Sequence, residues 1–311
     1  MTASPFVSVI MPAYNAEKTL EQAVNSILGQ TYTNLELLIV DDCSADDTYR
    51  IAESFLADKR VKLLKNEKNL GYLESSNLLF KEAKGDFITF MDADDWSSPE
   101  RIEKFLKAFE KDPGLACIGS DVIKTTYEGE PAEEMRFPNT DQEIKAQLPD
   151  RIPCVGSALM LRKKVLQDIG AYHPFFNRLG SEDLYWFGKI ALKYKVASLP
   201  EFLYFYRGNP ASVSNNHRAL RARISEDLAK FLLAQNIKQG SDGLSNPHLQ
   251  KAFNLYILKK EAKLHLWDRD YKTGLQKMLK VLFKRPVQNK EFYSDFVILL
   301  KGSLKPKAVA Q

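Results

Sequence analysis

Short apolar runs alternate with helical apolar patterns along the first half of the chain. The runs predict four buried strands, at 6–11, 35–40, 61–64 and 87–91. Apolar residues at three- and four-residue spacing predict helices beside them, at 15–28, 44–55, 75–83 and 99–111. Strands that are apolar throughout and alternate with helices are typical of a mostly parallel sheet covered on both faces. We therefore expect an α/β fold.

The rest of the chain has two different patterns. Further strands are predicted at 117–123, 157–161 and 203–207, with helices at 163–169 and 183–194 and a polar excursion at 127–150. From Arg218 onward every segment has a helical pattern, with lysines between its apolar positions. We expect one α/β domain over 1–215, made of halves at 1–115 and 116–215, and a helical C-terminal region over 216–311.

Composition indicates a globular chain, with 44% hydrophobic and 27% charged residues among 311. No apolar run approaches the roughly 18 residues of a membrane span, and no secretory signal is recognisable. Three widely spaced cysteines, Cys43, Cys117 and Cys154, are typical of reduced thiols. We expect a cytoplasmic protein.

The net charge of +4 is unevenly distributed, because residues 251–311 hold 14 Lys and Arg against 5 Asp and Glu. Such a basic tail suits nucleic acid, an anionic membrane surface or solvent. The tail lacks the aromatic and zinc-finger signatures of nucleic-acid modules, so we expect no nucleic-acid partner. Two hypotheses remain: the tail packs on the preceding domain, or it lies on a membrane, with the apolar run 296–300 contributing.

Polar and acidic residues follow three of the predicted strands. The strands end in Pro12-Ala13-Tyr14-Asn15, in Asp41-Asp42 and in Asp92-Ala93-Asp94-Asp95. Ligands of such sheets bind beyond the carboxyl ends of the strands, so we expect these residues to gather at one edge. Acids after strands also cap helices, which is the alternative interpretation of Asp41 and Asp42.

Asp92 and Asp94 are one residue apart at the mouth of a buried strand. Their carboxylates suit a hard divalent cation, Mg²⁺ or Mn²⁺, whose other ligands come from water and from substrate phosphates. Such an ion stabilises a nucleoside diphosphate as a leaving group.

Several segments in this order resemble family 2 glycosyltransferases of the GT-A fold. They are 8–15, 40–44, 69–71, 90–95, 156–162, 180–183 and 204–207. The resemblance covers about residues 5–215 and implies an inverting transfer from a nucleotide-diphosphate sugar to a hydroxyl. It makes 1–115 the nucleotide-binding half and 116–215 the acceptor-binding half.

The resemblance also implies roles for single residues in donor binding. Pro12 and Tyr14 would line the base and ribose pocket, and Asp42 would accept the hydrogen bond of a uracil N3–H. The other residues expected to bind the nucleotide sugar are Asn15, Asn69, Gly71, Asp92 and Arg207.

For the metal and the chemistry, Asp94 would be the direct ligand, with Asp92 beside it. Asp183, in the pair Glu182-Asp183, matches the general base of the family. One base suffices if the metal stabilises the leaving group. The alternative interpretation of the pair is an ordinary acidic helix start.

One motif departs from the family pattern. Family members often carry Arg at the position of Ser76, where it could neutralise a diphosphate. In this chain Lys68, Arg207 or the metal must compensate, or the donor is handled differently.

We expect a metal-dependent transferase that takes a UDP-sugar and acts on a glycan or lipid-linked acceptor in polysaccharide or lipopolysaccharide biosynthesis. It would be cytoplasmic or peripheral on the cytoplasmic face of the inner membrane. A sugar-phosphate nucleotidyltransferase would have a glycine-rich loop after the first strand, and residues 12–20 contain no Gly. A catalytically degenerate scaffold is the other alternative, which the intact Asp92, Asp94 and Asp183 disfavour.

Overall fold

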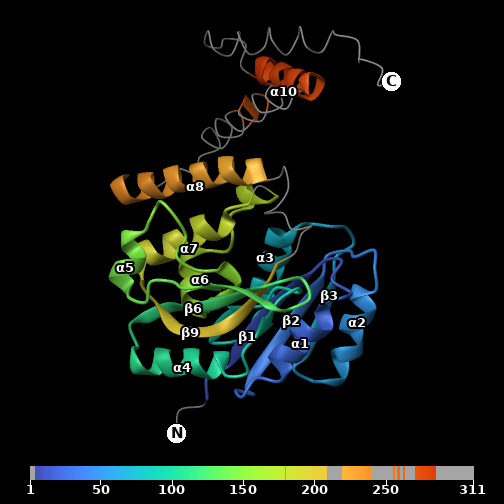
Figure 1. Ribbon diagram of the computed structural model, residues 1–311, viewed down its shortest axis with the longest axis vertical. Coiled ribbons are helices and arrows are strands. Elements are labelled where there is room, and N and C mark those ends of the chain that lie inside the picture. Colours follow the sequence, from blue (N-terminus) through green and yellow to red (C-terminus); the bar gives the residue numbers. More distant parts are fainter. Residues whose placement is uncertain are drawn as a thin grey trace.

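The computed structural model describes residues 4–178, 180–208, 219–239 and 270–284, with the single positions 255, 258, 259 and 262. One sheet of nine strands forms the centre of the described part, with helices on both faces (Figure 1). Its order is β3-β2-β1-β4-β8-β6-β9-β5, and β7 pairs with β6. The expected α/β fold is confirmed.

The strands differ in direction across the sheet. Strands β3, β2, β1 and β4 are mutually parallel, as are β6 and β9, whereas β8, β5 and β7 run antiparallel to their neighbours. Their bounds are β1 Val7–Ala13, β2 Leu35–Asp41, β3 Val61–Lys65, β4 Phe87–Phe90, β5 Trp96–Ser97, β6 Leu115–Thr125, β7 Pro131–Met135, β8 Met160–Arg162 and β9 Lys195–Arg207.

Two apolar cores lie on opposite faces of the sheet, which explains why the parallel strands are apolar throughout. Along β1, Val9 and Met11 enter one core and Ile10 enters the other, as the alternation of side chains in a strand requires. Helices α1 (Leu20–Leu28), α2 (Thr48–Ser54) and α4 (Arg101–Lys111) bury residues in the first core. The second core contains residues of α3 (Tyr72–Glu82), α5 (Asp141–Ala146), α6 (Lys163–Ile169) and α7 (Glu182–Lys193).

The prediction of a strand at 157–161 was partly wrong. Gly156–Ala158 forms a 3-10 turn, and only Met160–Arg162 is strand β8. Both conformations bury the same apolar side chains, so the hydrophobic pattern could not distinguish them. The excursion at 127–150 contains β7 and α5, which begins with a capping box between Thr140 and Glu143.

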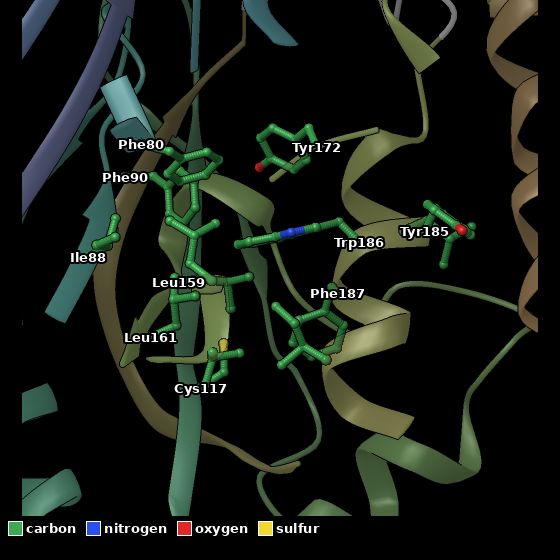
Figure 2. Close-up of a cluster of buried hydrophobic side chains, with 14 of the residues drawn as sticks. Phe80, Ile88, Phe90, Cys117, Leu159, Leu161, Tyr172, Tyr185, Trp186 and Phe187 are labelled. Carbon is green, nitrogen blue, oxygen red and sulfur yellow. The ribbon is translucent and has the colours of Figure 1, made fainter. Parts of the chain in front are cut away.

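Helix α7 is fixed to the sheet by aromatic packing. The Trp186 ring lies 4.9 Å from Tyr172, 5.7 Å from Phe80 and 5.9 Å from Phe90, measured between ring centroids. Figure 2 shows Trp186 pointing from α7 toward Phe80 and Phe90, with Tyr185 on the opposite side of the helix. This packing holds α7 against the sheet.

Helix α8 (Ala219–Gln239) covers α7 from outside (Figure 1). Its residues Leu228, Ala229, Leu232 and Leu233 are buried in the same core as α7. Gly188 of α7 makes room for Leu233, since a side chain at position 188 would collide with it. A domain boundary at 215 stays a prediction, although α8 beyond it completes the core of the domain before it.

Helix α10 (Tyr271–Lys284) lies beyond α8, away from the sheet (Figure 1). Its Met278 and Val281 form a small cluster with Ala262, while Phe283 is 90% exposed. Within the described ranges, no helix has the length and apolar character to cross a membrane. The apolar run 296–300 lies outside the described residues.

Truncation tests whether α8 is part of the domain. A chain ending at residue 215 should lose on the order of 5 kcal/mol of stability, because three buried leucines of α8 no longer cover α7. A chain ending at residue 239 is the control and should unfold near the full-length midpoint. Urea unfolding of the three chains measures the difference. Equal midpoints for the chains ending at 215 and 239 would contradict the assignment of α8 to this core.

Candidate active site

The carboxyl ends of β1, β2 and β4 open into one cleft of about 1480 Å³. The in-register pairing of Ala13 with Asp41 and of Ile10 with Phe90 brings the three strand ends to the same edge. All the residues predicted for the site line this cleft: Pro12, Tyr14, Asn15, Asp42, Asn69, Gly71, Asp92, Asp94, Glu182, Asp183 and Arg207. The structure thus brings these residues together; the roles assigned to them stay predictions.

Asp42 fastens the loop 66–71, which we call the motif loop. One carboxylate oxygen accepts from Asn66 Nδ2 and the Leu70 N–H, and the other accepts from the Gly71 N–H, each at 2.8 Å. The carboxylate is 3% exposed. A further hydrogen bond from a nucleobase would therefore use a remaining lone pair of a group that already holds the loop.

The loop after β1 is braced by the loop after β2. Asn15 has a left-handed φ of 50°; its N–H donates to Ser44 Oγ at 3.0 Å, and its Oδ1 accepts from the Ala45 N–H at 2.9 Å. Tyr14 beside it is 52% exposed, whereas Pro12 is buried. An exposed ring next to a fixed loop is available for contact with a ligand.

The segment 92–95 after β4 is supported by β9. Asp95, 1% exposed, accepts from Tyr204 Oη and from the Arg207 N–H, both at 2.8 Å. The Asp92 N–H donates to Tyr204 Oη at 3.3 Å. Asp95 therefore orients the segment, whereas Asp92 and Asp94 line the cleft.

Two buried guanidinium groups stand behind this segment. Arg207 donates from Nε to the Asp94 carbonyl at 2.7 Å and from its two Nη atoms to Tyr127 O and Gln22 Oε1. Arg101, wholly buried, donates to the Phe90 and Ser157 carbonyls. Burial lowers the pKa of Arg101 to about 10. Both side chains bond to neutral acceptors, so neither cancels a cleft carboxylate by a direct ion pair.

Asp92 and Asp94 fit a divalent cation. Asp92 Oδ1 is buried without a hydrogen-bond partner among the described residues, which is costly for a carboxylate oxygen and suits a metal ligand. In the same part of the chain, no group of three or more His, Cys, Asp or Glu side chains could hold a metal ion. A cation here would therefore take its remaining ligands from the substrate or from water.

Asp183 lies at the start of α7, in close contact with the turn Gly156–Ala158. Tyr172 Oη donates to Asp183 Oδ1 at 2.7 Å. A Cβ atom at position 156 would overlap the carboxylate, so only glycine lets Asp183 sit there. The turn before the helix is strained: Arg178 and Ser181 have φ of 61° and 64°, and Gly180 has φ of 84°.

Three acidic side chains of the cleft, those of Asp92, Glu182 and Asp183, hold their protons more tightly than usual. Burial raises the pKa of Asp92 to about 7, with Asp94 and Asp183 adding repulsion. Burial likewise raises the pKa of Glu182 to about 8, with repulsion from Asp183 and Asp92. Burial raises the pKa of Asp183 too, against the hydrogen bond from Tyr172. These shifts show that the carboxylates from β4 and α7 repel one another across the cleft.

Sequence reasoning missed several residues of the site. In the sequence Gly156 stands out only as part of a motif, and its contact with Asp183 explains why the motif needs glycine. No local sequence pattern marks Tyr172 and Arg178. Their place in the site comes from contacts with distant residues, those of Tyr172 with Asn77 of α3 and those of Arg178 with Asn69 of the motif loop. Arg101 is a charged residue in an amphipathic helix, where solvent exposure is the usual expectation.

The pKa shift of Glu182 predicts how stability depends on pH. The folded protein binds a proton at Glu182 up to about pH 8, whereas the unfolded chain releases it near 4.5. Stability of the ligand-free protein should therefore fall as pH rises through that window. Glu182→Gln removes this loss and should raise Tm at pH 8 by about 2–4 °C per kcal/mol of burial and repulsion cost relieved.

Thermal unfolding of both proteins from pH 5 to 8 checks this expectation. The gap in Tm between variant and wild type should shrink toward pH 5, where wild-type Glu182 is protonated when folded. A gap that is the same at every pH would contradict the raised pKa of Glu182.

Comparison with known proteins places the chain in a family. The family model described as glycosyl transferase family 2 matches residues 8–170. An uncharacterized glycosyltransferase of Haemophilus influenzae is 36% identical over 312 residues, covering 96% of this chain and 97% of the relative. The Escherichia coli protein named UDP-Glc:alpha-D-GlcNAc-diphosphoundecaprenol beta-1,3-glucosyltransferase WfgD is 48% identical over 98 residues, 31% of this chain and 38% of that protein.

Solved structures agree with the fold. The S. aureus TarS 1–349 structure in complex with UDP-GlcNAc has a TM-score of 0.62 at 18% identity, covering 89% of this chain and 80% of that chain. This chain spans 52% of the longer TarS chain. At this level of identity the likeness shows a shared fold, and the sequence matches show the family. The chain belongs to glycosyl transferase family 2 and is a glycosyltransferase of the GT-A fold.

Proposed function

We propose that this enzyme transfers a sugar from a UDP-sugar to a hydroxyl group of a glycan or lipid-linked acceptor, with inversion at the anomeric carbon. One observation carries the proposal. The cleft combines two carboxylates suited to a divalent cation, Asp92 and Asp94, with a separate carboxylate suited to proton removal, Asp183. Polysaccharide or lipopolysaccharide biosynthesis is the proposed setting.

The names of relatives support the donor and the acceptor. WfgD is named for transfer of glucose from UDP-Glc to a diphosphoundecaprenol-linked sugar, and another relative is a chondroitin synthase of Escherichia coli. The TarS neighbour holds UDP-GlcNAc, and a mannosyltransferase neighbour holds GDP-Man and Mn²⁺. We assign uracil to the pocket at Asp42, Pro12 and Tyr14, with Asn15, Asn69 and Gly71 forming its walls.

Asp94 and Asp92 would hold Mg²⁺ or Mn²⁺ on the cleft side of β4. The bound cation would stabilise the negative charge of the departing diphosphate. The protein contributes rigidity, because Asp95, Tyr204 and Arg207 hold the backbone of this segment. The two ligands therefore need little rearrangement when the donor binds.

Asp183 would take the proton from the acceptor hydroxyl as that oxygen attacks the anomeric carbon. A single displacement inverts the configuration and needs one base, on the face opposite the leaving group. Tyr172 fixes one oxygen of Asp183, and burial raises its pKa, which makes the carboxylate a better proton acceptor. Glu182 beside it also holds its proton tightly, because burial, with repulsion from Asp183 and Asp92, raises its pKa to about 8.

A donor panel tests the function itself. Purified protein is incubated with UDP-, GDP- and dTDP-sugars in Mn²⁺, and release of each nucleoside diphosphate is measured. We expect turnover with a UDP-sugar. The absence of turnover with every donor and every acceptor preparation tried would favour the scaffold alternative.

Asp94→Ala should abolish turnover and leave the fold intact, because it removes a ligand of the cation. Mn²⁺ affinity, measured by calorimetry, should also fall in the variant. In the wild type it should rise when UDP is added, since the two carboxylates need further ligands. Full wild-type activity in excess chelator would exclude this role of the metal.

Asp183→Asn should lower the turnover rate by about 10²-fold or more with UDP affinity kept, since the amide cannot accept a proton. Gly156→Ala should have a similar effect, because the added methyl group displaces the Asp183 carboxylate. Steady-state kinetics and UDP titrations separate the two effects. A variant that kept its turnover but lost UDP affinity would remove Asp183 from the role of base.

We further propose that the basic C-terminal region lies on the anionic cytoplasmic face of the membrane, where a lipid-linked acceptor is found. One face of α10 carries exposed Lys272 and Lys280 together with Leu279 and the almost fully exposed Phe283. Cations contribute about 1 kcal/mol each near an anionic surface, and apolar side chains enter the headgroup region. Met278 and Val281, on the other face, support the alternative of packing alone.

Co-sedimentation with anionic vesicles tests the membrane proposal. The full chain should bind at low salt and dissociate at high salt, whereas the chain ending at residue 239 should not bind. Binding that is absent at low salt, or that survives the truncation, would leave only the packing role for this region.

A further inference from the structure

The cleft is poor in positive charge for a site that binds a diphosphate. Eight carboxylates line it, those of Glu17, Asp42, Asp46, Asp92, Asp94, Glu128, Glu182 and Asp183. Among the described residues, the cations that line it are Lys18, Arg178 and Arg207. Ser76, at the position where family members often have Arg, is wholly buried, and its hydroxyl donates to Tyr72 O.

The cations expected from the sequence to replace that Arg are engaged or lie elsewhere. Arg207 uses all three nitrogens of its guanidinium on acceptors of the protein itself. Lys68 does not line the cleft. Lys18 does, but no hydrogen bond or ion pair to a described residue holds its flexible side chain in place, so binding a phosphate would cost it more entropy.

Arg178 is held over the motif loop from a different part of the chain. Its Nη2 donates to Asn69 O at 2.8 Å and to Asn69 Oδ1 at 2.7 Å. Gly71 lies close to this segment: a Cβ there would come within 2.8 Å of Asn177 Oδ1 and would touch Arg178 Cγ and Nε at 3.6 Å, an ordinary contact distance. The neighbouring Asn177 Nδ2 donates to Leu70 O at 3.1 Å, which fastens the same two segments.

The charge of Arg178 is not used within the described part of the chain. Both of its acceptors are neutral oxygens of Asn69, and the exposed guanidinium forms no ion pair with a described residue despite the acidic cleft. Its backbone has a left-handed φ of 61°, a costly conformation for a non-glycine residue that often occurs at ligand-binding sites. A fixed guanidinium presents a fork of donors that suits phosphate oxygens.

We propose that Arg178 binds the diphosphate of the donor and thereby replaces the arginine that the family motif lacks at Ser76. The inference rests on the proposed function, because it takes a nucleotide-diphosphate sugar as the donor. It adds a binding residue, Arg178, that precedes Glu182 and Asp183 closely in the sequence. The bound donor would then contact both the nucleotide-binding half of the cleft and the segment that carries the general base, Asp183.

The experiment compares UDP with uridine, which lacks the diphosphate. Calorimetric titrations in Mn²⁺ use wild type, Arg178→Gln, Arg178→Lys and the control Arg151→Gln. Arg151 is also exposed and also donates to an amide oxygen, that of Gln147, but lies outside the cleft lining. Arg178→Gln should weaken UDP binding by about tenfold or more, the usual worth of a hydrogen bond to a charged group, and leave uridine binding unchanged. Arg178→Lys should recover part of the loss.

The outcomes distinguish this inference from the proposed function. If Arg178→Gln bound UDP as tightly as wild type, Arg178 would have no role in donor binding. Equal losses for UDP and uridine would assign Arg178 to the nucleoside, against the inference. If wild type bound no nucleoside diphosphate at all, the proposed function would fail first, whatever the variants did. Equal thermal midpoints of the four proteins verify that the variants fold.

Discussion

Electrostatic repulsion among the carboxylates of the cleft is the interaction around which the site is organised. Asp92 and Asp94 come from the end of β4, and Glu182 and Asp183 from the start of α7. Burial, with added repulsion from neighbouring carboxylates, raises the pKa of Asp92 to about 7 and that of Glu182 to about 8. The guanidinium groups of Arg207 and Arg101 do not relieve this repulsion by ion pairs, since both bond to neutral oxygens. A cation bound here would offset the repulsion and favour the ionised form of these carboxylates.

Keeping like charges close requires a stiff frame, and the fold provides one on each side. The frame on the β4 side is Asp95 with its two hydrogen bonds from β9. On the α7 side, the Trp186 cluster and α8 hold the helix against the sheet. Ser225 of α8 donates to the carbonyl of Gly180, in the strained turn before the base. The catalytic edge is therefore supported by residues as far along the chain as α8.

The sequence was most informative where functional residues directly follow a recognisable strand. Apolar strands that end in acids predicted the parallel part of the sheet and the edge at which Pro12, Asp42 and Asp92 meet, because register follows from strand pairing. The resemblance added Glu182, Asp183 and Arg207, which also line the cleft. The 3-10 turn at Gly156–Ala158 and the contacts of Tyr172 and Arg178 could not be predicted. They depend on distant segments crossing, which leaves no periodicity in the chain.

The contact between Gly156 and Asp183 also links the fates of two positions that are 27 residues apart in the sequence. As long as natural selection keeps a carboxylate at position 183, any residue other than glycine at 156 is unfavourable, because its Cβ atom would overlap that carboxylate. In a related protein that has lost catalysis, a smaller side chain can replace Asp183. A side chain at position 156 then no longer collides with a carboxylate. We expect glycine at 156 to be lost soon after the acid at 183 in lineages that become inactive. The pair would then record which branches of this family still turn over a substrate.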